Sequence, residues 1–437
     1  MGRAGLHGPN SVILYLPRSE KGLGIIKLTH YFKNGAIVRE HLLKHSDDPV
    51  IRRLAERRLE QGRENAHLKW TAPEQLHTAE RGLFNDHLMN AGQQGRAGIG
   101  FGSQHRGELP EAGTSEHRQA VTQWLKTQNV QELLVSLTAL SRQQDWRQWD
   151  AIMAQDLSWG RLLYRMAESD VKFLLQGTLQ ILPTPQYLRT MGYIPGMSCP
   201  LCGTKCCSFK HIASYCPFAL EQQRYTWRHN EVLKLLHYVI GLCVRALQKR
   251  GKPKKPPAKK ASFVLQGQDL PKKEKDGQVS LLEQACDWHI TVDLPAVTYK
   301  FPFHIAVTEK RPDLVIWSET LRVIVLLELT VPHESNVQAA HARKMASYTK
   351  LQQECRDAGY RVELLPVEVG VLGYVADSTK HALKKLGVWS KELHGNISEM
   401  AMRCTYAIYV QHKTKSWTDW RMFQPSKYSQ KGKEPDD

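Results

Sequence analysis

Hydrophobic residues follow two different spacings along this chain of 437 residues. In the first part they recur every three or four positions, a spacing that predicts amphipathic helices. These helices are expected around residues 32–45, 49–69, 117–145 and 159–178. Two stretches depart from this pattern. The run VILYLP at 12–17 predicts a short strand, and residues 90–115, rich in Gly, Gln and Arg, predict a loop.

From residue 288 to residue 388 the spacing changes to the alternation that is typical of strands. Strands are expected near 303–308, 313–317 and 322–331, and again within 361–373. The helices expected around them lie at 230–250, 336–359 and 377–387. The order is therefore one helix, three strands, a helix, a strand and a helix. This order predicts an α+β fold whose mixed sheet is covered by helices on both faces.

The balance of charge limits the expected partners. The net charge is +17 at pH 7, and each phosphate that a basic side chain neutralises releases condensed counterions. We therefore expect DNA as the partner, with RNA as a second candidate; a basic surface that serves only solubility is the alternative. The segment KRGKPKKPPAKK at 249–260 concentrates the charge. It could be a nuclear localisation signal, an arm that contacts phosphates, or a solvated linker.

Cysteine usage and hydropathy limit the cellular compartments in which the protein is expected. No apolar run approaches the length of a membrane span, so no membrane partner is expected. The N-terminal residues lack the apolar region and cleavage site of a signal peptide. Five of the nine cysteines fall within residues 199–216 and the others are scattered. This distribution favours a metal site in a reducing compartment over a disulfide framework.

The stretch CPLCGTKCCSFKHIASYC has the spacing of a zinc site. Its ligands would be Cys199, Cys202, His211 and Cys216, in the order C-x2-C-x8-H-x4-C. Two cysteines two residues apart form a knuckle, and a His and a Cys on the next helical turn complete a tetrahedron. Four ligands leave no open position, so one structural zinc ion is expected. Cys206 and Cys207 fit the spacing less well and are alternatives as ligands or as small apolar fillers.

Two carboxylates stand out in RPDLVIWSETLRVIVLLELTVP, residues 311–332. Asp313 opens the first of two expected strands, and Glu328 lies within the apolar run of the second. The 14 residues between them suffice for a hairpin that brings the two side chains together. Such a pair could bind one divalent cation, with Mg²⁺ or Mn²⁺ suited to oxygen ligands. An unpaired buried carboxylate would cost several kcal/mol.

The helix expected after this hairpin supplies a cation. Its apolar stripe consists of Val337, Ala340, Lys344, Tyr348, Leu351 and Cys355. A lysine in this stripe needs a carboxylate or a phosphate, so we expect Lys344 near Glu328. Two carboxylates, a metal ion and a lysine are the minimal set for phosphodiester hydrolysis. A buried lysine–glutamate pair without chemistry is the alternative. Glu368 is a further candidate to support these ligands, and Glu231 ranks after it.

The ordered set of motifs resembles a known family. The motifs are the cysteine cluster, then RYTWRHNEVL, then RPD-x14-E, then K-x3-Y and PVEVG. Together they resemble the C-terminal region of non-long-terminal-repeat retrotransposon proteins that carry a restriction-like endonuclease. Upstream, ILYLPRSEKGLGI resembles the segment after the polymerase thumb, and the stretch from DLSWGRLLYRM to the cluster resembles the linker before the zinc knuckle.

The resemblance implies a function and a set of site residues. Cys199, Cys202, His211 and Cys216 would bind zinc in a CCHC knuckle that helps to position DNA. Asp313 and Glu328 would hold a catalytic Mg²⁺ or Mn²⁺, Lys344 would be the active-site lysine, and Tyr348 would be its helical neighbour. The enzyme would nick target DNA in the nucleus and so provide a primer for reverse transcription. The segment ELT at 328–330 departs from the E-x-K of many restriction enzymes, and a lysine from the next helix resolves this in the family.

The resemblance also gives a domain plan. A mostly helical post-thumb and linker region is expected at 1–190, the zinc knuckle at 191–222 and the first nuclease helix at 223–250. A basic, disordered linker at 251–280, a restriction-like αβββαβα core at 281–390 and a C-terminal helix with a basic tail at 391–437 would follow.

The motif of a polymerase palm is missing from the sequence. The only Asp-Asp pair, in KHSDDPV, is flanked by polar residues and Pro. We therefore expect no DNA synthesis by this chain alone, and a separate polymerase-containing polypeptide is a candidate partner. A catalytically inactive nucleic-acid-binding protein and a decayed retrotransposon fragment are the alternatives to an endonuclease.

Overall fold

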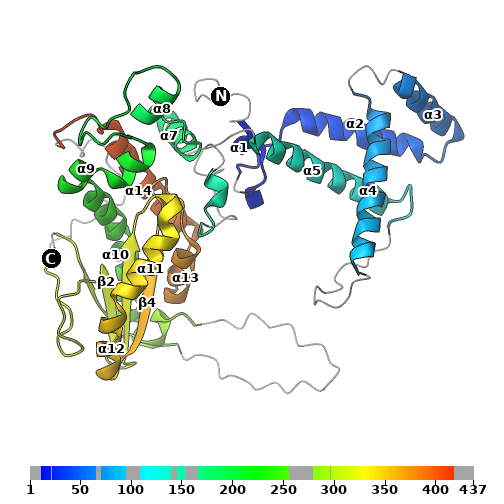
Figure 1. The fold of residues 1–437 in the computed structure, drawn as a ribbon. Helices are drawn as coiled ribbons and strands as arrows, with labels where there is room; N and C mark the ends of the chain where they lie inside the picture. Colours follow the sequence, from blue (N-terminus) through cyan, green and yellow to red (C-terminus); the bar gives the residue numbers. More distant parts are fainter. Residues whose placement is uncertain are drawn as a thin grey trace. The chain divides into compact units, whose positions relative to one another are not determined.

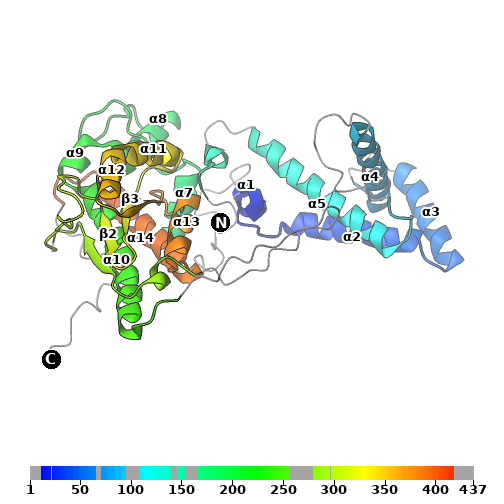
Figure 2. The ribbon, with the colours of Figure 1, turned by 90° about the horizontal axis from the view of Figure 1, so that it is seen from below.

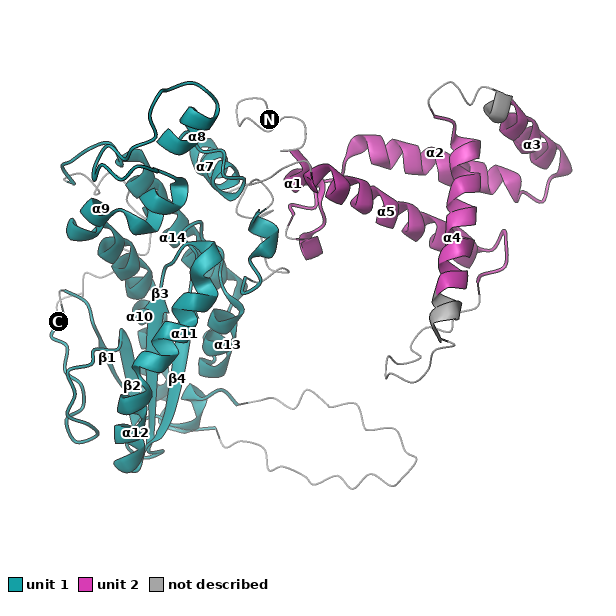
Figure 3. Ribbon diagram, viewed as in Figure 1, with its two compact units in different colours: residues 1–5, 142–437 teal, residues 6–141 magenta. Residues whose placement is uncertain are grey.

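The computed structural model (Figures 1 and 2) describes residues 11–20, 22–64, 70–94, 109–138, 145–152, 166–254, 279–295 and 297–417. The chain divides into two compact units, which Figure 3 shows in different colours. The helical unit comprises residues 6–141, and the mixed unit comprises residues 1–5 and 142–437. The division therefore falls inside the range 1–190 that the domain plan treats as one region. Most of the expected basic linker, residues 255–278, lies outside the described residues.

The helical unit is built around α2, α4 and α5. Its elements are α1 (Val12–Tyr15), η3 (Arg18–Glu20), α2 (Leu28–Lys44), α3 (Pro49–Glu64), α4 (Ala72–Gln94) and α5 (Ser115–Thr138). Six buried residues pack α2, α4 and α5 together: Ile37, Ala72, Leu76, Ala79, Val121 and Leu125. Helix α4 runs into the region expected as a loop, so the prediction for residues 90–94 was wrong.

The expected strand at 12–17 was also wrong, because residues 12–15 form the helical turn α1. The N–H of Leu16 donates to the carbonyl of Val12 at 3.0 Å, which closes the turn. Val12, Ile13, Leu14 and Leu16 are all buried. A run of consecutive apolar residues suits any element that is enclosed on all sides, so periodicity alone does not separate a strand from a buried turn.

The mixed unit combines a four-stranded sheet with helices. Before the sheet lie η4 (Asp145–Gln148), α7 (Glu168–Thr178), α8 (Pro185–Thr190), the π-helix η5 (His211–Tyr215), α9 (Pro217–Glu221), α10 (Arg224–Arg250) and η6 (Leu282–Gln284). The strands are β1 (His289–Val292), β2 (Leu314–Ser318), β3 (Val323–Thr330) and β4 (Arg361–Glu368). Between β3 and β4 lie η7 (Glu334–Asn336), α11 (Val337–Ser347) and α12 (Thr349–Asp357), and after β4 come α13 (Asp377–Leu386) and α14 (Lys391–Val410).

The sheet is mixed, as the sequence predicted. Its order is β1-β2-β3-β4, in which the first two pairs are antiparallel and β3 pairs with β4 in parallel. The chain is therefore an α+β protein. A parallel neighbour requires a crossover connection, and α11 and α12 provide it. The single helix expected at 336–359 is divided at Tyr348 into these two helices.

The first strand lies earlier in the chain than predicted. Residues 303–308 are not a strand, and β1 is His289–Val292. The N–H groups of Ile305 and Ala306 both donate to the carbonyl of Pro302, which folds this run into a turn. Phe303 and Val307 are 82% and 90% exposed. Among the alternating apolar residues Phe303, Ile305 and Val307, only Ile305 is buried, in the cluster that contains Val315 and Leu326. The alternation therefore does not mark a strand here.

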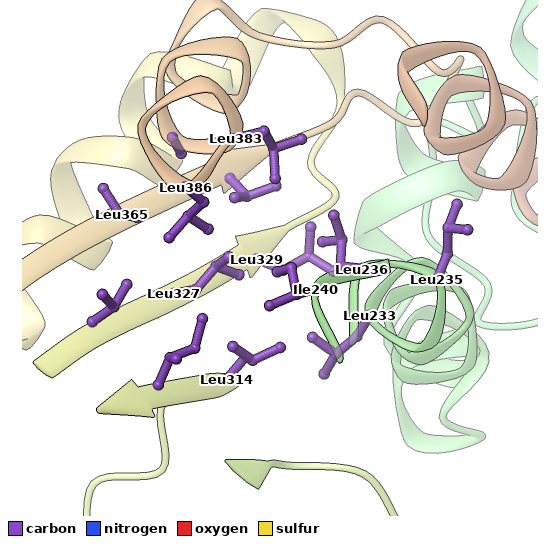
Figure 4. Packing of buried hydrophobic residues seen from close by; sticks show 14 of the residues in the cluster. Leu233, Leu235, Leu236, Ile240, Leu314, Leu327, Leu329, Leu365, Leu383 and Leu386 are labelled. Atoms are coloured by element: carbon purple, nitrogen blue, oxygen red, sulfur yellow. The ribbon is translucent and has the colours of Figure 1, made fainter. Parts of the chain in front are cut away.

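Helices cover both faces of the sheet, as predicted (Figure 2). On one face Leu314, Leu327 and Leu329 pack against α10, α13 and α14 in one buried cluster (Figure 4). On the other face Val315 and Leu326 pack against α12 in a second cluster. Full burial of one such side chain contributes about 1.5–3 kcal/mol. No helix in the described ranges is long and apolar enough to cross a membrane.

Arg228 of α10 is buried and joins three elements. Its Nη1 donates to the carbonyl of Ala213 at 2.9 Å and to the hydroxyl of Thr405 at 3.1 Å. Its Nη2 donates to the carbonyl of Val331 at 3.0 Å. Burial lowers the pKa of Arg228 to about 10, so the guanidinium still carries its charge at neutral pH. One buried cation thus connects the π-helix η5, helix α14 and the end of β3.

Candidate active site and zinc cluster

The hairpin of β2 and β3 brings Asp313 and Glu328 side by side. Leu314 pairs with Leu327, and the same antiparallel register places Asp313, one residue earlier, opposite Glu328. Side chains alternate along a strand, so Asp313 lies on the same face as Val315, and Glu328 on the same face as Leu326. That face is covered by α11 and α12. The backbone N–H of Asp313 donates to Glu328 Oε2 at 3.3 Å.

Lys344 contacts Glu328, as the stripe on the sequence predicted. Its Nζ forms an ion pair with Glu328 Oε1. The Glu328 side chain is 2% exposed, whereas the Lys344 side chain is 36% exposed at the edge of α11. Burial raises the pKa of Glu328, and repulsion from Asp313 adds to this, while Lys344 acts in the opposite direction. The pair therefore combines a buried carboxylate with an ammonium group that reaches solvent.

Asp313 is held by a backbone amide and by a histidine. Its Oδ2 accepts from the N–H of Leu329 at 2.7 Å and lies 3.3 Å from Nε2 of His229. Burial of His229 opposes protonation, but the hydrogen bond and the charge of Asp313 outweigh it and raise the pKa of His229. In the described residues these two contacts both use Oδ2 of Asp313. His229 therefore orients the Asp313 carboxylate.

His229 was not singled out in the sequence. It comes from α10, 84 positions before Asp313, and no spacing along the chain connects the two residues. The available signal was its place in RYTWRHNEVL, one of the motifs that carry the family resemblance. The contact depends on how α10 packs against the sheet, which a linear pattern does not encode.

Tyr348 lies beside the two carboxylates. Its ring is buried, and its hydroxyl lies 3.5 Å from the carbonyl of Arg311 and also hydrogen-bonds with Glu328. Burial raises the pKa of Tyr348, so the phenol stays protonated and acts as a donor to Glu328. α11 ends at Ser347 and α12 begins at Thr349, so Tyr348 lies at the break between the two helices.

The two further carboxylate candidates have other partners. Glu368 of β4 lies on the same sheet face and is buried, but it accepts from Ser378 and pairs with Nδ1 of His341 at 2.9 Å. His341 precedes Lys344 by one turn of α11, so this helix pairs with both Glu328 and Glu368. Glu231 pairs with Lys234 at 2.7 Å on its own helix. The structure thus gives Glu231 a local partner.

The donors at Asp313 and Glu328 suit a hard cation, but they provide only two protein carboxylates. Carboxylate oxygens are the protein ligands that Mg²⁺ prefers, and Mg²⁺ usually keeps several waters beside one or two carboxylates. Among the described residues, no group of three or more His, Cys, Asp and Glu ligand atoms gathers at this hairpin. A cation here would therefore have two protein carboxylates, and water or phosphate oxygens would complete its coordination.

The four cysteine and histidine residues of the predicted zinc site do come together. One ligand atom from each of Cys199, Cys202, His211 and Cys216 lies within 4.8 Å of the others, so the cluster could hold a zinc ion. The sulfur atoms of Cys199 and Cys216 are 4.0 Å apart, and Cys202 Sγ is 3.3 Å from His211 Nε2. A tetrahedron with Zn–S bonds of about 2.3 Å places its sulfur atoms about 3.8 Å apart. The donor set and its spacing therefore fit zinc.

Local structure explains how the sequence builds this cluster. The N–H of Gly203 donates to the carbonyl of Cys199 at 2.9 Å, and the N–H of Cys199 donates to Thr204 at 2.8 Å. Gly203 has a φ of 74°, a conformation that a glycine adopts without strain. The π-helix η5 carries His211, and Cys216 follows it directly. The loop and the helix thus converge on one point.

Cys206 and Cys207 are outside this group of ligands. Cys206 is exposed, and Cys207 is fully buried in a small cluster with Ile212 and Ala219. Burial raises the pKa of the Cys207 thiol. Cys207 therefore packs as a small apolar residue, one of the two roles that the sequence left open.

The structure brings the predicted residues into two groups. Asp313, Glu328, Lys344 and Tyr348 meet at the hairpin, and the zinc ligands meet before α10. No protein-family model matches the chain, and no curated protein matches it.

Proposed function

We propose that the mixed unit is a metal-dependent DNA endonuclease of the restriction-like type, related to the C-terminal region of non-long-terminal-repeat retrotransposon proteins. The observation that carries the proposal is the group of Asp313, Glu328 and Lys344 on one sheet face. Three strands between α10 and α11, followed by β4 and α13, match the αβββαβα order of that nuclease class.

Each residue has a role in hydrolysis of a phosphodiester. Asp313 and Glu328 would hold the cation, and a bound cation would supply activation of water and neutralisation of charge on the phosphate. His229 keeps the Asp313 carboxylate in place through its contact with Oδ2. Lys344 reaches solvent at the edge of the site, so its ammonium group can contact the phosphate. Tyr348 fixes the orientation of Glu328 by its hydroxyl.

The zinc cluster and the charge of the chain support nucleic acid as the substrate. A closed site with four ligands is structural, and Arg228 connects it to the sheet that carries the carboxylates. The net charge of +17 favours a polyanion. In the cell the protein would act in the nucleus on DNA, and a separate polymerase-containing polypeptide would extend the nicked end.

Nicking of supercoiled plasmid in Mg²⁺ or Mn²⁺ tests the proposal. Asp313→Asn should lower the nicking rate at least about a hundredfold, the scale for loss of one group that stabilises transition-state charge. Asp357→Asn is the matched control, because Asp357 is exposed on α12 and bonds only to Gln353 among the side chains described. Equal rates for the wild type and Asp313→Asn would reject the assignment.

A catalytically inactive nucleic-acid-binding protein is the second candidate. The ion pair between Lys344 and Glu328 favours it, because this pair already neutralises the carboxylate without a metal ion. The inactive protein would bind DNA or RNA with strong salt dependence, and Asp313→Asn would leave that binding unchanged. Binding without nicking in either metal would select this candidate over the endonuclease.

A further inference from the structure

A second cluster of possible metal ligands lies in the helical unit, far along the chain from the cysteine cluster. It consists of His41 and His45 from α2, Glu80 from α4 and His117 from α5. One ligand atom from each lies within 4.8 Å of the others. His41 and His117 are buried, and His45 and Glu80 are partly buried. The cluster therefore joins the three helices that form the unit's core.

Each of three ligands lies one helical turn from a core residue. His41 follows Ile37 by four positions, Glu80 follows Leu76 by four, and His117 precedes Val121 by four. Residues four apart lie on the same face of a helix. The ligand group thus continues the hydrophobic contact between α2, α4 and α5 with polar side chains, where more apolar residues would otherwise be expected.

Hydrogen bonding within the protein leaves this cluster incomplete. Nε2 of His41 lies 2.9 Å from Nδ1 of His117, which is one hydrogen bond between two imidazoles. The buried atoms Nε2 of His45 and Oε1 of Glu80 face each other at 3.6 Å, and neither has a hydrogen-bond partner among the described residues. Buried polar atoms without partners destabilise the folded state. A bound ion would satisfy both.

Neighbouring groups hold two of the ligands in place. Lys44 Nζ donates to Oε2 of Glu80 at 2.5 Å, so the other oxygen, Oε1, is directed to the histidines. Gly113 packs on the ring of His45, and a Cβ at this position would come within 3.2 Å of Nδ1. Gly113 also has a φ of 91°, so a larger residue is disfavoured on both grounds.

We propose that His41, His45, Glu80 and His117 bind a divalent transition-metal ion, with Zn²⁺ as the expected metal. Imidazole and carboxylate donors suit Zn²⁺, and four protein ligands in a tetrahedron leave no position for a substrate. The site is therefore structural. It cross-links α2, α4 and α5, whose shared hydrophobic cluster contains only six buried residues among those described. Binding of the metal stabilises the folded unit by mass action.

The alternative is that the four side chains pair with one another without a metal ion. It would consist of a hydrogen-bonded pair, His41 and His117, beside an ion pair of protonated His45 with Glu80. This arrangement predicts no metal content beyond that of the cysteine cluster. The metal content of the full chain therefore separates the two.

The decisive measurement is the zinc content of the purified full chain by mass spectrometry. We expect two zinc ions per chain, one for each cluster. His45→Gln should lower the content to one, and Cys202→Ser should also lower it to one. His77→Gln is the matched control, because His77 is an exposed histidine on α4 outside the cluster, and it should keep two. One zinc in the wild type that is unchanged in His45→Gln would overturn the proposal.

A second measurement does not depend on the folding of histidine variants. In the full chain with Cys199→Ser and Cys202→Ser, added Co²⁺ should give the visible bands of a tetrahedral ion without thiolate charge-transfer bands. The melting temperature of the helical unit should rise when the metal is added. A spectrum of hexa-aqua Co²⁺ and an unchanged melting temperature would reject the site.

Discussion

Two buried carboxylates near the end of β3 are stabilised in opposite ways. Glu328 points to a solvent-reaching ammonium group, with a second carboxylate opposite it on the next strand. Glu334 of η7 is also buried, but its Oε1 accepts from the backbone N–H of Leu372 at 2.6 Å and lies against Gly370. Its Oε2 has no hydrogen-bond partner among the described residues.

Under the proposed function, this difference separates a carboxylate that would bind the cation from one that serves packing. Burial raises the pKa of Glu334 to about 8, and the more distant charge of Arg228 reduces this shift only in part. Glu334 is thus largely protonated at neutral pH, whereas Glu328 has a lysine in direct contact. Burial does not by itself mark a functional acid. What distinguishes Glu328 is its charged partner, Lys344, whose ammonium group reaches solvent.

The largest expected effect is a difference in nicking activity between variants of Glu328 and variants of Glu334. Glu328→Gln should lower plasmid nicking at least about a hundredfold, because it removes one of two carboxylates that would hold the cation. Glu334→Gln should leave nicking within about threefold of the wild type, because the amide keeps the shape and the contact with Leu372. Equal losses in both variants would remove the distinction between the two carboxylates.

The next effect concerns the packing around Glu334. A Cβ at Gly370 would lie 2.2 Å from Glu334 Oε1. Gly370→Ala should therefore lower the free energy of unfolding by about 1–3 kcal/mol, the usual cost of overpacking. Gly196→Ala is the control, because nothing lies within 4 Å of a Cβ there. Urea unfolding measures the free energy of unfolding of both variants. The same stability for the two would show that the side chain of Glu334 can move to make room for the added methyl group.

Glu334 should also make stability depend on pH. Its folded pKa of about 8 lies above the ordinary glutamate value of 4.5, so the folded state binds the proton more tightly than the unfolded state does. This contribution is complete below the unfolded pKa and is lost as pH rises through about 8. Between these values the free energy of unfolding should fall by up to about 1.4 kcal/mol per pH unit.

The matched variant for this pH dependence is Glu334→Gln, which cannot ionise. Denaturant unfolding at about pH 6 and about pH 8 should give a smaller decrease for Glu334→Gln than for the wild type. The same decrease in both proteins would assign the pH dependence to other groups and would show that Glu334 is charged in the folded state.

The smallest effect concerns the ion pair of Glu328. Lys344→Met should lower the free energy of unfolding by about 1 kcal/mol or less, because the ammonium group is partly exposed and screened by solvent. The loss should shrink further at high salt. A loss much larger than this at neutral pH would indicate that Glu328 depends on Lys344 as strongly as a fully buried pair does.

Linear patterns were informative where the contacts are local or follow one element. The alternation in β2 and β3 and the stripe on α11 were enough to place Glu328 beside Lys344 and to give a mixed sheet covered on both faces. The knuckle spacing C-x2-C-x8-H-x4-C brought together four ligands within 18 residues. Each of these inferences needs only the geometry of one hairpin, one helix or one loop.

Contacts between elements that lie far apart in the sequence could not be predicted in this way. His229 reaches Asp313 from another helix, and His117 reaches His41 across 76 positions. The pair His41 and His45, four residues apart on a helix, was the one local signal of the second cluster, and it did not indicate Glu80 or His117. The prediction of a strand at 303–308 was wrong because these residues form a turn in which Phe303 and Val307 are exposed and only Ile305 of the alternating apolar residues is buried.

Arg228 limits how the mixed unit can be divided or inherited. Its guanidinium is shared by η5, α14 and the end of β3. A fragment that begins after Cys216 would therefore leave the buried cation without the carbonyl of Ala213, although Thr405 and Val331 remain. A buried charge would lose one acceptor, so a chimera that keeps Arg228 should be joined upstream of Cys199 and not after Cys216.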